Sequence, residues 1–304
     1  MSAYHIPVML RESVAALAVK PNGIYVDATF GGGGHTRAIL EQLQDGHIYA
    51  FDRDADAAAN VSKDKRFTFI HNNFKYLQNC LRYLGCREVD GILADLGVSS
   101  HQFDTQERGF SFRFEAPLDM RMNQQAPINA AQVLNQYSEQ ELERIFRQYG
   151  EIAQSKRAAA LIVKAREQKP IKDTESLRSA LAPMIPAQQL HKFLSTLYQA
   201  IRIEVNGEIA ALAALLEQSL RLLKSGGRLA VISYHSLEDR MVKNFMRSGN
   251  TMGTLSKDFY GNAETPFTVV TKKAIVPTPQ ERAQNNRARS AKLRVVEKRN
   301  TPAP

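Results

Sequence analysis

The stretch GIYVDATFGGGGH, at residues 23–35, decides how this chain folds. Its first half is rich in β-branched and aromatic residues and predicts a buried strand, and residues 36–43 carry apolar side chains at helical spacing. A strand, a glycine run and a helix in that order bring the backbone close to a nucleotide-like ligand. We therefore predict an α/β fold with a ligand-binding loop at Gly31–Gly34. A flexible glycine linker is the alternative, but linkers rarely join two such well-formed elements.

The spacing of the glycines distinguishes between cofactors. A dinucleotide-binding loop has the pattern G-x-G-x-x-G, but here Thr36 stands in the third glycine position, and no Gly-Lys-Ser/Thr of a phosphate-binding loop follows. A loop with only the first two glycines, Gly31 and Gly33, suits a ligand that approaches the backbone closely but has no pyrophosphate. S-adenosylmethionine is the common ligand of that kind, so the loop predicts it as the cofactor.

Three residues near the ends of later strands are predicted to face the same crevice, because ligands of open α/β sheets bind at the carboxyl ends of the strands. Asp52 follows the strand at 47–51, about 20 residues beyond the glycines, and is placed to bind a ribose diol. It could also be the N-cap of the next helix. Phe74 follows the third strand and could stack on an adenine ring or be an ordinary core residue. Asp95 ends the fourth strand.

Composition excludes several classes of protein. No apolar stretch approaches the roughly 20 residues of a membrane helix, and charged residues near the N-terminus argue against a signal peptide, so we predict a cytoplasmic protein without membrane contact. The two cysteines, Cys80 and Cys86, form no C-x-x-C pair and have no histidine-rich neighbours. We therefore predict neither a metal site nor a disulfide framework.

The net charge of +9 is concentrated near the C-terminus. Residues 272–299 contain nine basic and two acidic side chains, which is typical of a site for a polyanion. The alternative is a solvated tail. Two predicted strands, at 266–271 and 291–296, flank a loop that contains Arg287 and Arg289. We therefore predict that a structured hairpin carries the charge.

The α/β pattern stops after Asp95 and resumes with an amphipathic helix at 208–224. The residues between are largely helical in pattern. We predict an α/β domain formed by residues 1–106 and 206–304, with a helical subdomain inserted at 107–205.

The beginning of the insert mixes aromatic residues with arginines. Residues 107–114 contain Arg108 and three phenylalanines, a composition that can stack a base and hold a phosphate. A buried strand with the phenylalanines on one face is the alternative. Asp119 and Arg121 follow as an acid–base pair that is either structural or orients a substrate.

The segment SYHSLEDR at residues 233–240 closes the predicted sheet. Ser236 and Asp239 resemble a capping box, which predicts a helix over 240–247 and leaves Tyr234 and His235 at the carboxyl end of a strand. His235 is either a structural residue or a proton acceptor in the crevice. No Ser-His-Asp or Cys-His pattern indicates covalent catalysis.

Taken together, these segments resemble the RsmH (MraW) family of 16S rRNA (cytosine-N4)-methyltransferases. The matching stretches are HIPVML at 5–10, DATFGGGGH at 27–35, FDRD at 51–54, DLGVSS at 95–100, RGFSF at 108–112, PLDMRM at 117–122, SYHSLEDR at 233–240 and NRARS at 286–290. The resemblance implies a class I (Rossmann-like) methyltransferase sheet with an inserted helical substrate-recognition domain. It also implies S-adenosylmethionine as methyl donor and a cytidine in the decoding region (P site) of 16S rRNA, in the small ribosomal subunit, as acceptor.

The resemblance also assigns site residues. The family's cofactor contacts fall on Gly33, Gly34, His35, Asp52, Phe74, Asp95 and Gln102. Gln102 comes from the resemblance alone. We expect Arg108, Asp119 and Arg121 to contact substrate and His235 to accept protons from the amine. Two positions depart from the family's pattern, Gly32 in the loop and Glu204 in a helix where an apolar residue is expected.

Two other functions stay open at this point. One is a ribosome assembly factor that binds S-adenosylmethionine without turnover. The other is an amino-methyltransferase that acts on another nucleic acid or on a small molecule, although the basic hairpin argues against a small molecule. The choice of RNA over DNA rests on the resemblance, and the sequence leaves a homodimer open.

Overall fold

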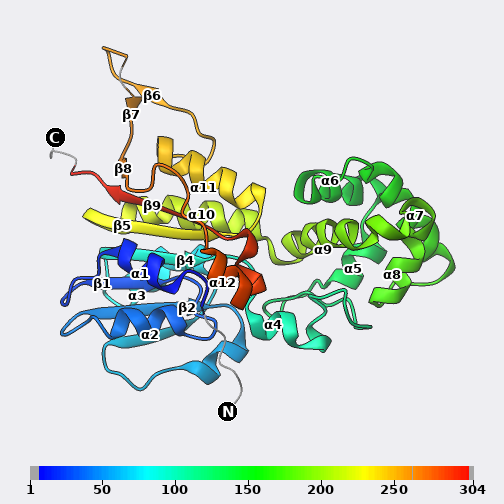
Figure 1. Ribbon diagram of the computed structural model, residues 1–304, viewed down its shortest axis with the longest axis horizontal. Coiled ribbons are helices and arrows are strands. Elements are labelled where there is room, and N and C mark those ends of the chain that lie inside the picture. The colour runs from blue at the N-terminus through cyan, green and yellow to red at the C-terminus, as the bar shows by residue number, and fades with distance from the viewer. Residues whose placement is uncertain (1–6, 262, 301–304) are drawn as a thin grey trace. The chain divides into compact units, whose positions relative to one another are not determined.

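The computed structural model describes residues 7–261 and 263–300, so the first two residues of the motif at 5–10 lie outside the described residues (Figure 1). Contacts divide the chain into two compact units, one formed by the residues up to Gly97 with those from Ile209 onward, and the other by Val98–Glu208. The predicted insert, 107–205, starts later than the second unit because Val98 and Phe103 pack with the helical unit's apolar cluster.

The first unit is built on a seven-stranded sheet with the order β3-β2-β1-β4-β5-β9-β8. The strands are β1 (Ile24–Asp27), β2 (His47–Asp52), β3 (Phe67–His71), β4 (Val89–Asp95), β5 (Leu223–Ser233), β8 (Phe267–Val269) and β9 (Lys292–Lys298). Strands β1 to β5 are parallel, whereas β9 is antiparallel to both β5 and β8. The strand order reverses between β1 and β4, where doubly wound sheets bind their ligands. The predicted Rossmann-like α/β fold is confirmed.

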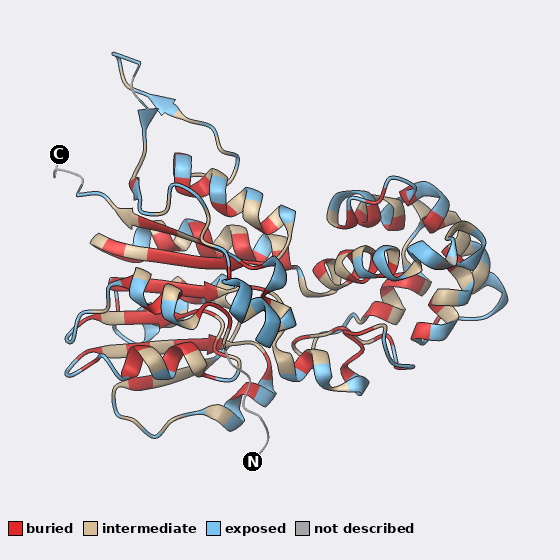
Figure 2. Ribbon diagram, in the orientation of Figure 1, coloured by how far each residue is buried: buried red, intermediate tan, exposed pale blue. Residues whose placement is uncertain are grey.

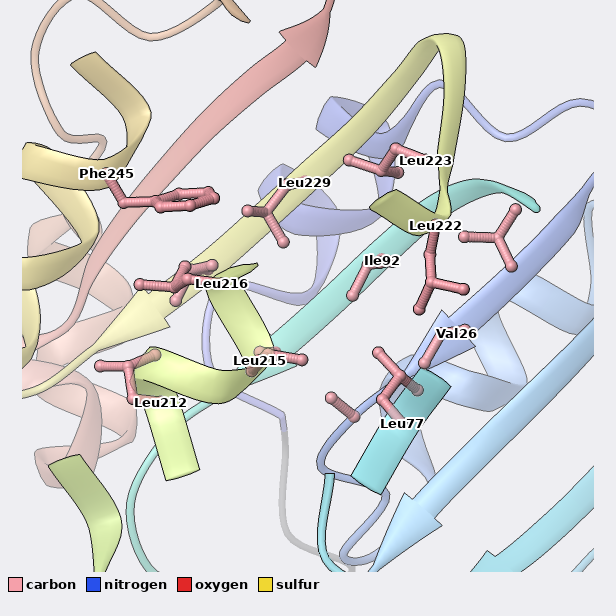
Figure 3. Close-up of a cluster of buried hydrophobic side chains, with 14 of the residues drawn as sticks. Val26, Leu77, Ile92, Leu212, Leu215, Leu216, Leu222, Leu223, Leu229 and Phe245 are labelled. Carbon is pink, nitrogen blue, oxygen red and sulfur yellow. The ribbon is translucent and has the colours of Figure 1, made fainter. Parts of the chain in front are cut away.

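Helices cover both faces of this sheet, and alternate strand residues point to opposite layers. Val26 and Leu229 pack in a cluster with apolar residues of α3, α10 and α11, as Figure 3 shows. Their neighbours Tyr25 and Ala230 pack on the other side, with α1 and α2. These helices are α1 (Leu10–Leu17), α2 (Gly34–Leu40), α3 (Leu77–Tyr83), α10 (Glu208–Leu222) and α11 (Ser236–Ser248). The strands of the sheet are accordingly mostly buried in Figure 2.

The predicted C-terminal hairpin is present, because β8 and β9 pair antiparallel with Phe267 opposite Lys298. The connection between them is not a simple loop: it contains α12 (Pro279–Gln284) and the 3₁₀ helix η6 (Asn286–Ser290). Thr278 caps α12 and Pro279 occupies its first turn, which are ordinary helix-start signals that the sequence interpretation missed. A second, two-stranded sheet pairs β6 (Ser256–Lys257) with β7 (Ala263–Glu264).

The second unit is helical. Its elements are α4 (Ser100–Asp104), η3 (Gln106–Arg108), α5 (Ala130–Gln136), α6 (Glu139–Gly150), α7 (Ser155–Gln168), α8 (Thr174–Leu181), η4 (Ala182–Met184), η5 (Ala187–Gln189) and α9 (Leu190–Asn206). Glu204 on α9 accepts hydrogen bonds from Tyr137 and Arg144, at 3.2 and 3.0 Å, which explains an acid at a position where an apolar residue was expected. Among the described residues, no helix is both long and apolar enough to cross a bilayer.

The phenylalanines of residues 107–114 do not share the face of a strand, so that alternative is wrong. Phe110 is buried and Phe112 packs edge-on against His191 and Tyr198, whereas Phe114 is exposed. The segment forms turns rather than a strand because Gly109, with a positive φ, ends η3 directly before Phe110.

Candidate active site

The glycine run forms a tight turn between β1 and α2. Gly31 and Gly33 have φ values of 50° and 72°, in the left-handed region that favours glycine, and Gly33 is the N-cap of α2. A Cβ on Gly34 would lie 2.0 Å from the ring of Pro7, whereas a Cβ on Gly32 would meet nothing within 4 Å. The loop therefore requires glycine on both sides of Gly32 but tolerates a larger residue at Gly32 itself.

Asp52 ties this loop to β2. Its carboxylate oxygens accept one hydrogen bond each, from the amide of Gly31 at 2.7 Å and from the amide of Asp54 at 2.9 Å. Burial raises the pKa of Asp52. The alternative that Asp52 caps the next helix is wrong, because Asp54 caps the 3₁₀ helix η1 (Ala55–Asn60). The contact of Asp52 with a ribose stays a prediction.

Thr36, which replaces the third glycine of a dinucleotide loop, satisfies a buried carboxylate. Its hydroxyl donates to Asp27 at 2.7 Å, and the amide of Thr29 donates to the other oxygen at 3.1 Å. Asp27 is 1% exposed, and burial raises its pKa. The sequence interpretation treated Asp27 only as a strand residue and missed this pair, although a threonine in a glycine position was a usable signal.

Asp95 stands at the carboxyl end of β4, beside the glycine loop. Its amide donates to the hydroxyl of Thr29 at 2.7 Å, which joins the ends of β1 and β4. Its carboxylate accepts a hydrogen bond of 2.6 Å from the hydroxyl of Tyr234, which follows β5. Burial raises the pKa of Asp95 to about 6, against the opposing effects of His35 and Tyr234. The pKa of Tyr234 is raised by its own burial and by Asp95.

His35 lies between the N-terminal segment and Asp95. Its Nε2 is 3.2 Å from the carbonyl of Val8, which can only accept, so Nε2 carries the proton of the neutral ring. Its Nδ1 faces Asp95 Oδ2 at 4.0 Å. Burial lowers the pKa of His35, so the ring is neutral near pH 7. The structure thus brings Gly31–Gly34, His35, Asp52 and Asp95 together at the switch point of the sheet.

His235 has a different setting from the one predicted. It is the N-cap of α11, which starts at Ser236 rather than at residue 240. Its Nδ1 accepts from the amide of Glu238 at 3.4 Å, and its Nε2 lies 3.1 Å from the carboxylate of the same residue. The predicted capping box is therefore wrong, since Asp239 pairs instead with Arg294 at 2.7 Å. The role of His235 as proton acceptor stays a prediction.

Phe74 belongs to η2 (Phe74–Tyr76), after β3. It is half-buried and packs against the apolar cluster of the sheet. This packing is that of an ordinary core residue. The contact of Phe74 with an adenine ring stays a prediction.

The remaining predicted site residues belong to the helical unit. Gln102 is buried in α4, where it forms a capping box with Ser99. Arg108 is only 5% exposed, and its guanidinium donates to the carbonyls of Arg121 and Met122 at 3.0 Å. Asp119 and Arg121 form the predicted ion pair at 2.6 Å. Local structure accounts for all of these contacts, so the cofactor and substrate roles of these residues stay predictions.

The hairpin presents most of its basic side chains to solvent. The exposed ones are Lys272, Lys273, Arg282, Arg289, Lys292 and Arg299. Arg294 is half-buried against Asp239, so it contributes to the packing of β9 on α11 rather than to the surface charge.

Comparison with known proteins gives a match over nearly the whole chain. The model of the MraW methylase family matches residues 2–299. A protein of Parabacteroides distasonis named ribosomal RNA small subunit methyltransferase H is 53% identical over 299 residues, which cover 98% of each chain. Proteins with the same name from Flavobacterium johnsoniae and Phocaeicola vulgatus are 54% and 53% identical, over 97% of this chain and 98% of theirs.

Proposed function

Because this chain belongs to the MraW methylase family, we propose that it transfers the methyl group of S-adenosylmethionine to the N4 amine of a cytidine in the decoding region of 16S rRNA. The family resemblance seen in the sequence is confirmed. The names of relatives that match 98% of the chain support the small ribosomal subunit as substrate. The observation that carries the proposal is the meeting of the glycine loop and Asp95 at the point where the strand order reverses.

The residues of the loop fit this cofactor. The turn at Gly31–Gly33 offers backbone without side chains, as close approach of a ligand requires. A carboxylate has about four lone-pair sites, and Asp52 uses one on each oxygen, so both oxygens can still accept from ribose hydroxyls. When bound, S-adenosylmethionine supplies an electrophilic methyl group.

The chain must make a poor nucleophile react. The amine of cytosine has its lone pair delocalised into the ring, so the protein has to accept hydrogen bonds from the amine and hold it at near-attack distance. Asp95 suits this role above pH 6, where it is ionised and held by Tyr234. His235 is the competing candidate, but both of its nitrogens face Glu238. We therefore favour Asp95 as the acceptor.

A methyl-transfer assay tests the proposal. Small ribosomal subunits from a strain without this gene are incubated with the protein and with S-adenosylmethionine carrying an isotopic label, and the modified nucleotide is mapped by mass spectrometry. We expect one labelled cytidine in the decoding region. Cofactor binding by calorimetry without transfer would favour the non-catalytic assembly factor, and label on another nucleic acid would favour a different substrate.

One variant tests the competing acceptor, His235. His235→Ala lowers turnover by about 10²-fold or more if the histidine accepts the proton. An unchanged rate with intact cofactor binding removes it from the mechanism.

The proposed substrate places the protein in the cytoplasm, and sedimentation velocity distinguishes a monomer from a homodimer.

A further inference from the structure

Residues 250–261 and 263–266 form an arm between α11 and β8 that projects away from the sheet (Figure 1). Its two strands, β6 and β7, pair over only two residues each, and their residues are exposed (Figure 2). A hairpin this short has no core of its own. Packing therefore does not explain its apolar residues. The root of the arm is fixed, because Arg247 donates to the carbonyl of Gly253 at 3.1 Å.

The tip of the arm is a turn that displays two aromatic rings. Asp258 and Gly261 close it: the amide of Gly261 donates to the carbonyl of Asp258 at 3.0 Å, and the carboxylate of Asp258 accepts from the amide of Tyr260 at 2.9 Å. The central positions hold Phe259 and Tyr260, which are 97% and 84% exposed. Their ring centroids are 5.6 Å apart, edge to face. Turns favour small or polar residues at such positions, so neither turn geometry nor burial accounts for these rings.

Basic side chains precede the arm on α11, whereas the arm itself carries Lys257 and the acids Asp258 and Glu264. Helix α11, which leads into it, exposes a stripe of Arg240, Lys243 and Arg247 at helical spacing, and Lys257 is exposed directly before the tip. Residues 240–299 contain thirteen basic and four acidic side chains. Exposed aromatic rings beside cations are the features with which proteins hold unpaired nucleotides, since the rings stack on bases and the cations contact phosphates.

We propose that Phe259 and Tyr260 stack on unpaired bases of the RNA substrate while the stripe on α11 contacts its phosphates. The identity of that RNA rests on the proposed function, but stacking itself does not depend on methyl transfer. The arm lies in the same unit as the glycine loop but contains none of the residues of that loop. Its role is therefore to anchor the RNA and not to take part in methyl transfer. Losing a base stack weakens binding by about 5- to 150-fold.

The absence of tryptophan from the sequence permits a direct test. In Phe259→Trp the new indole is the only one in the protein. We expect a single-stranded oligoribonucleotide of about 12 nucleotides, a length within the usual range of binding sites, to quench its emission. Polyglutamate, an anion without bases, should not. Tyr83→Trp is the matched control, because Tyr83 is 91% exposed on α3, outside the basic stripe. Equal quenching at both positions, or none at 259, would overturn the proposal.

Paired substitutions distinguish stacking from apolar docking. The double variant Phe259→Leu and Tyr260→Leu keeps an apolar tip without rings, and the double tryptophan variant keeps the rings. We expect the leucine pair to raise the KM for small ribosomal subunits by at least about 5-fold, the lower limit for one stack, with kcat and cofactor affinity unchanged. The tryptophan pair should behave like wild type. An unchanged KM in the leucine pair, or self-association through the arm, contradicts the proposal. If the wild-type protein transfers no methyl group, the proposed function fails, and the quenching assay still decides the role of the arm.

Discussion

Replacing Tyr234 by phenylalanine tests whether ionised Asp95 accepts the hydrogen bond of the amine. The substitution removes one hydroxyl, which donates to Asp95 at 2.6 Å, and leaves the ring in place. That hydrogen bond favours the charged carboxylate, so its loss raises the pKa of Asp95 above its present value of about 6. Hydrogen bonds to charged groups contribute about 1.5–3 kcal/mol, which corresponds to an increase of about one to two pH units.

The expected result is a displaced acid limb in the pH–rate profile of methyl transfer. At pH 6 the wild-type carboxylate is about half ionised, whereas that of the variant is about 1–10% ionised, so the rate falls about 5- to 50-fold. At pH 9 both are ionised and the rates agree within about twofold. The assay measures single-turnover transfer to small ribosomal subunits between pH 5 and 9.

Tyr198→Phe is the matched control, because it removes another buried hydroxyl, which contacts Thr174 at 3.1 Å and not Asp95. Its acid limb should stay in place. If the limb of Tyr234→Phe also stays in place while calorimetry shows intact cofactor binding, Asp95 does not set the pH dependence and the assignment of the acceptor is refuted.

Three further outcomes follow from the contacts of the site. Asp95→Asn removes a carboxylate whose pKa is raised on folding, so ionised Asp95 destabilises the fold, and this cost develops as the pH rises from about 4 to about 6. At pH 8 the free energy of unfolding, measured with denaturant, should therefore be about 1–3 kcal/mol higher in the variant, whereas at pH 3 the two proteins should be equal. Stability that does not depend on pH in this way would contradict the assigned pKa. Thr36→Val leaves buried Asp27 without its hydroxyl donor and should cost about 1–3 kcal/mol in the same measurement, and an unchanged midpoint would show that the hydrogen bond contributes nothing. Gly32→Ala should keep the cofactor affinity within about twofold, whereas Gly34→Ala should reduce it, because only a Cβ at residue 34 collides with a neighbour. Equal cofactor affinities of the two variants in calorimetry would contradict the loop geometry.

The parts of the fold that could be predicted are those with a local signature. The strand before Gly31, the turn itself and the helix after it follow from residue types within about a dozen positions. The start of α11 was misplaced because two cap patterns overlap there, and His235 rather than Ser236 occupies the cap. The arm was missed because strands of two residues show no periodicity.

The contacts that give the site its chemistry could not be predicted in the same way. Tyr234 and Asp95 are 139 residues apart in sequence and meet only because β4 and β5 are neighbours in the sheet. The raised pKa of Asp95 then depends on burial, which no single motif encodes. Motifs therefore indicated which segments matter, whereas tertiary packing determined which of their side chains interact.

The position of β9 has a consequence for how this protein reaches its native state. This strand, from near the end of the chain, lies inside the sheet between β5 and β8, and Glu281, just upstream of it, accepts a hydrogen bond of 2.7 Å from the amide of Met9. During synthesis, the edge of β5 that pairs with β9 has no partner until residues 292–298 have been translated. A product cut before Lys292 would keep that apolar edge open and be prone to aggregation. Completion of the sheet therefore depends on a strand near the end of the chain, although most of the other strands are made long before it.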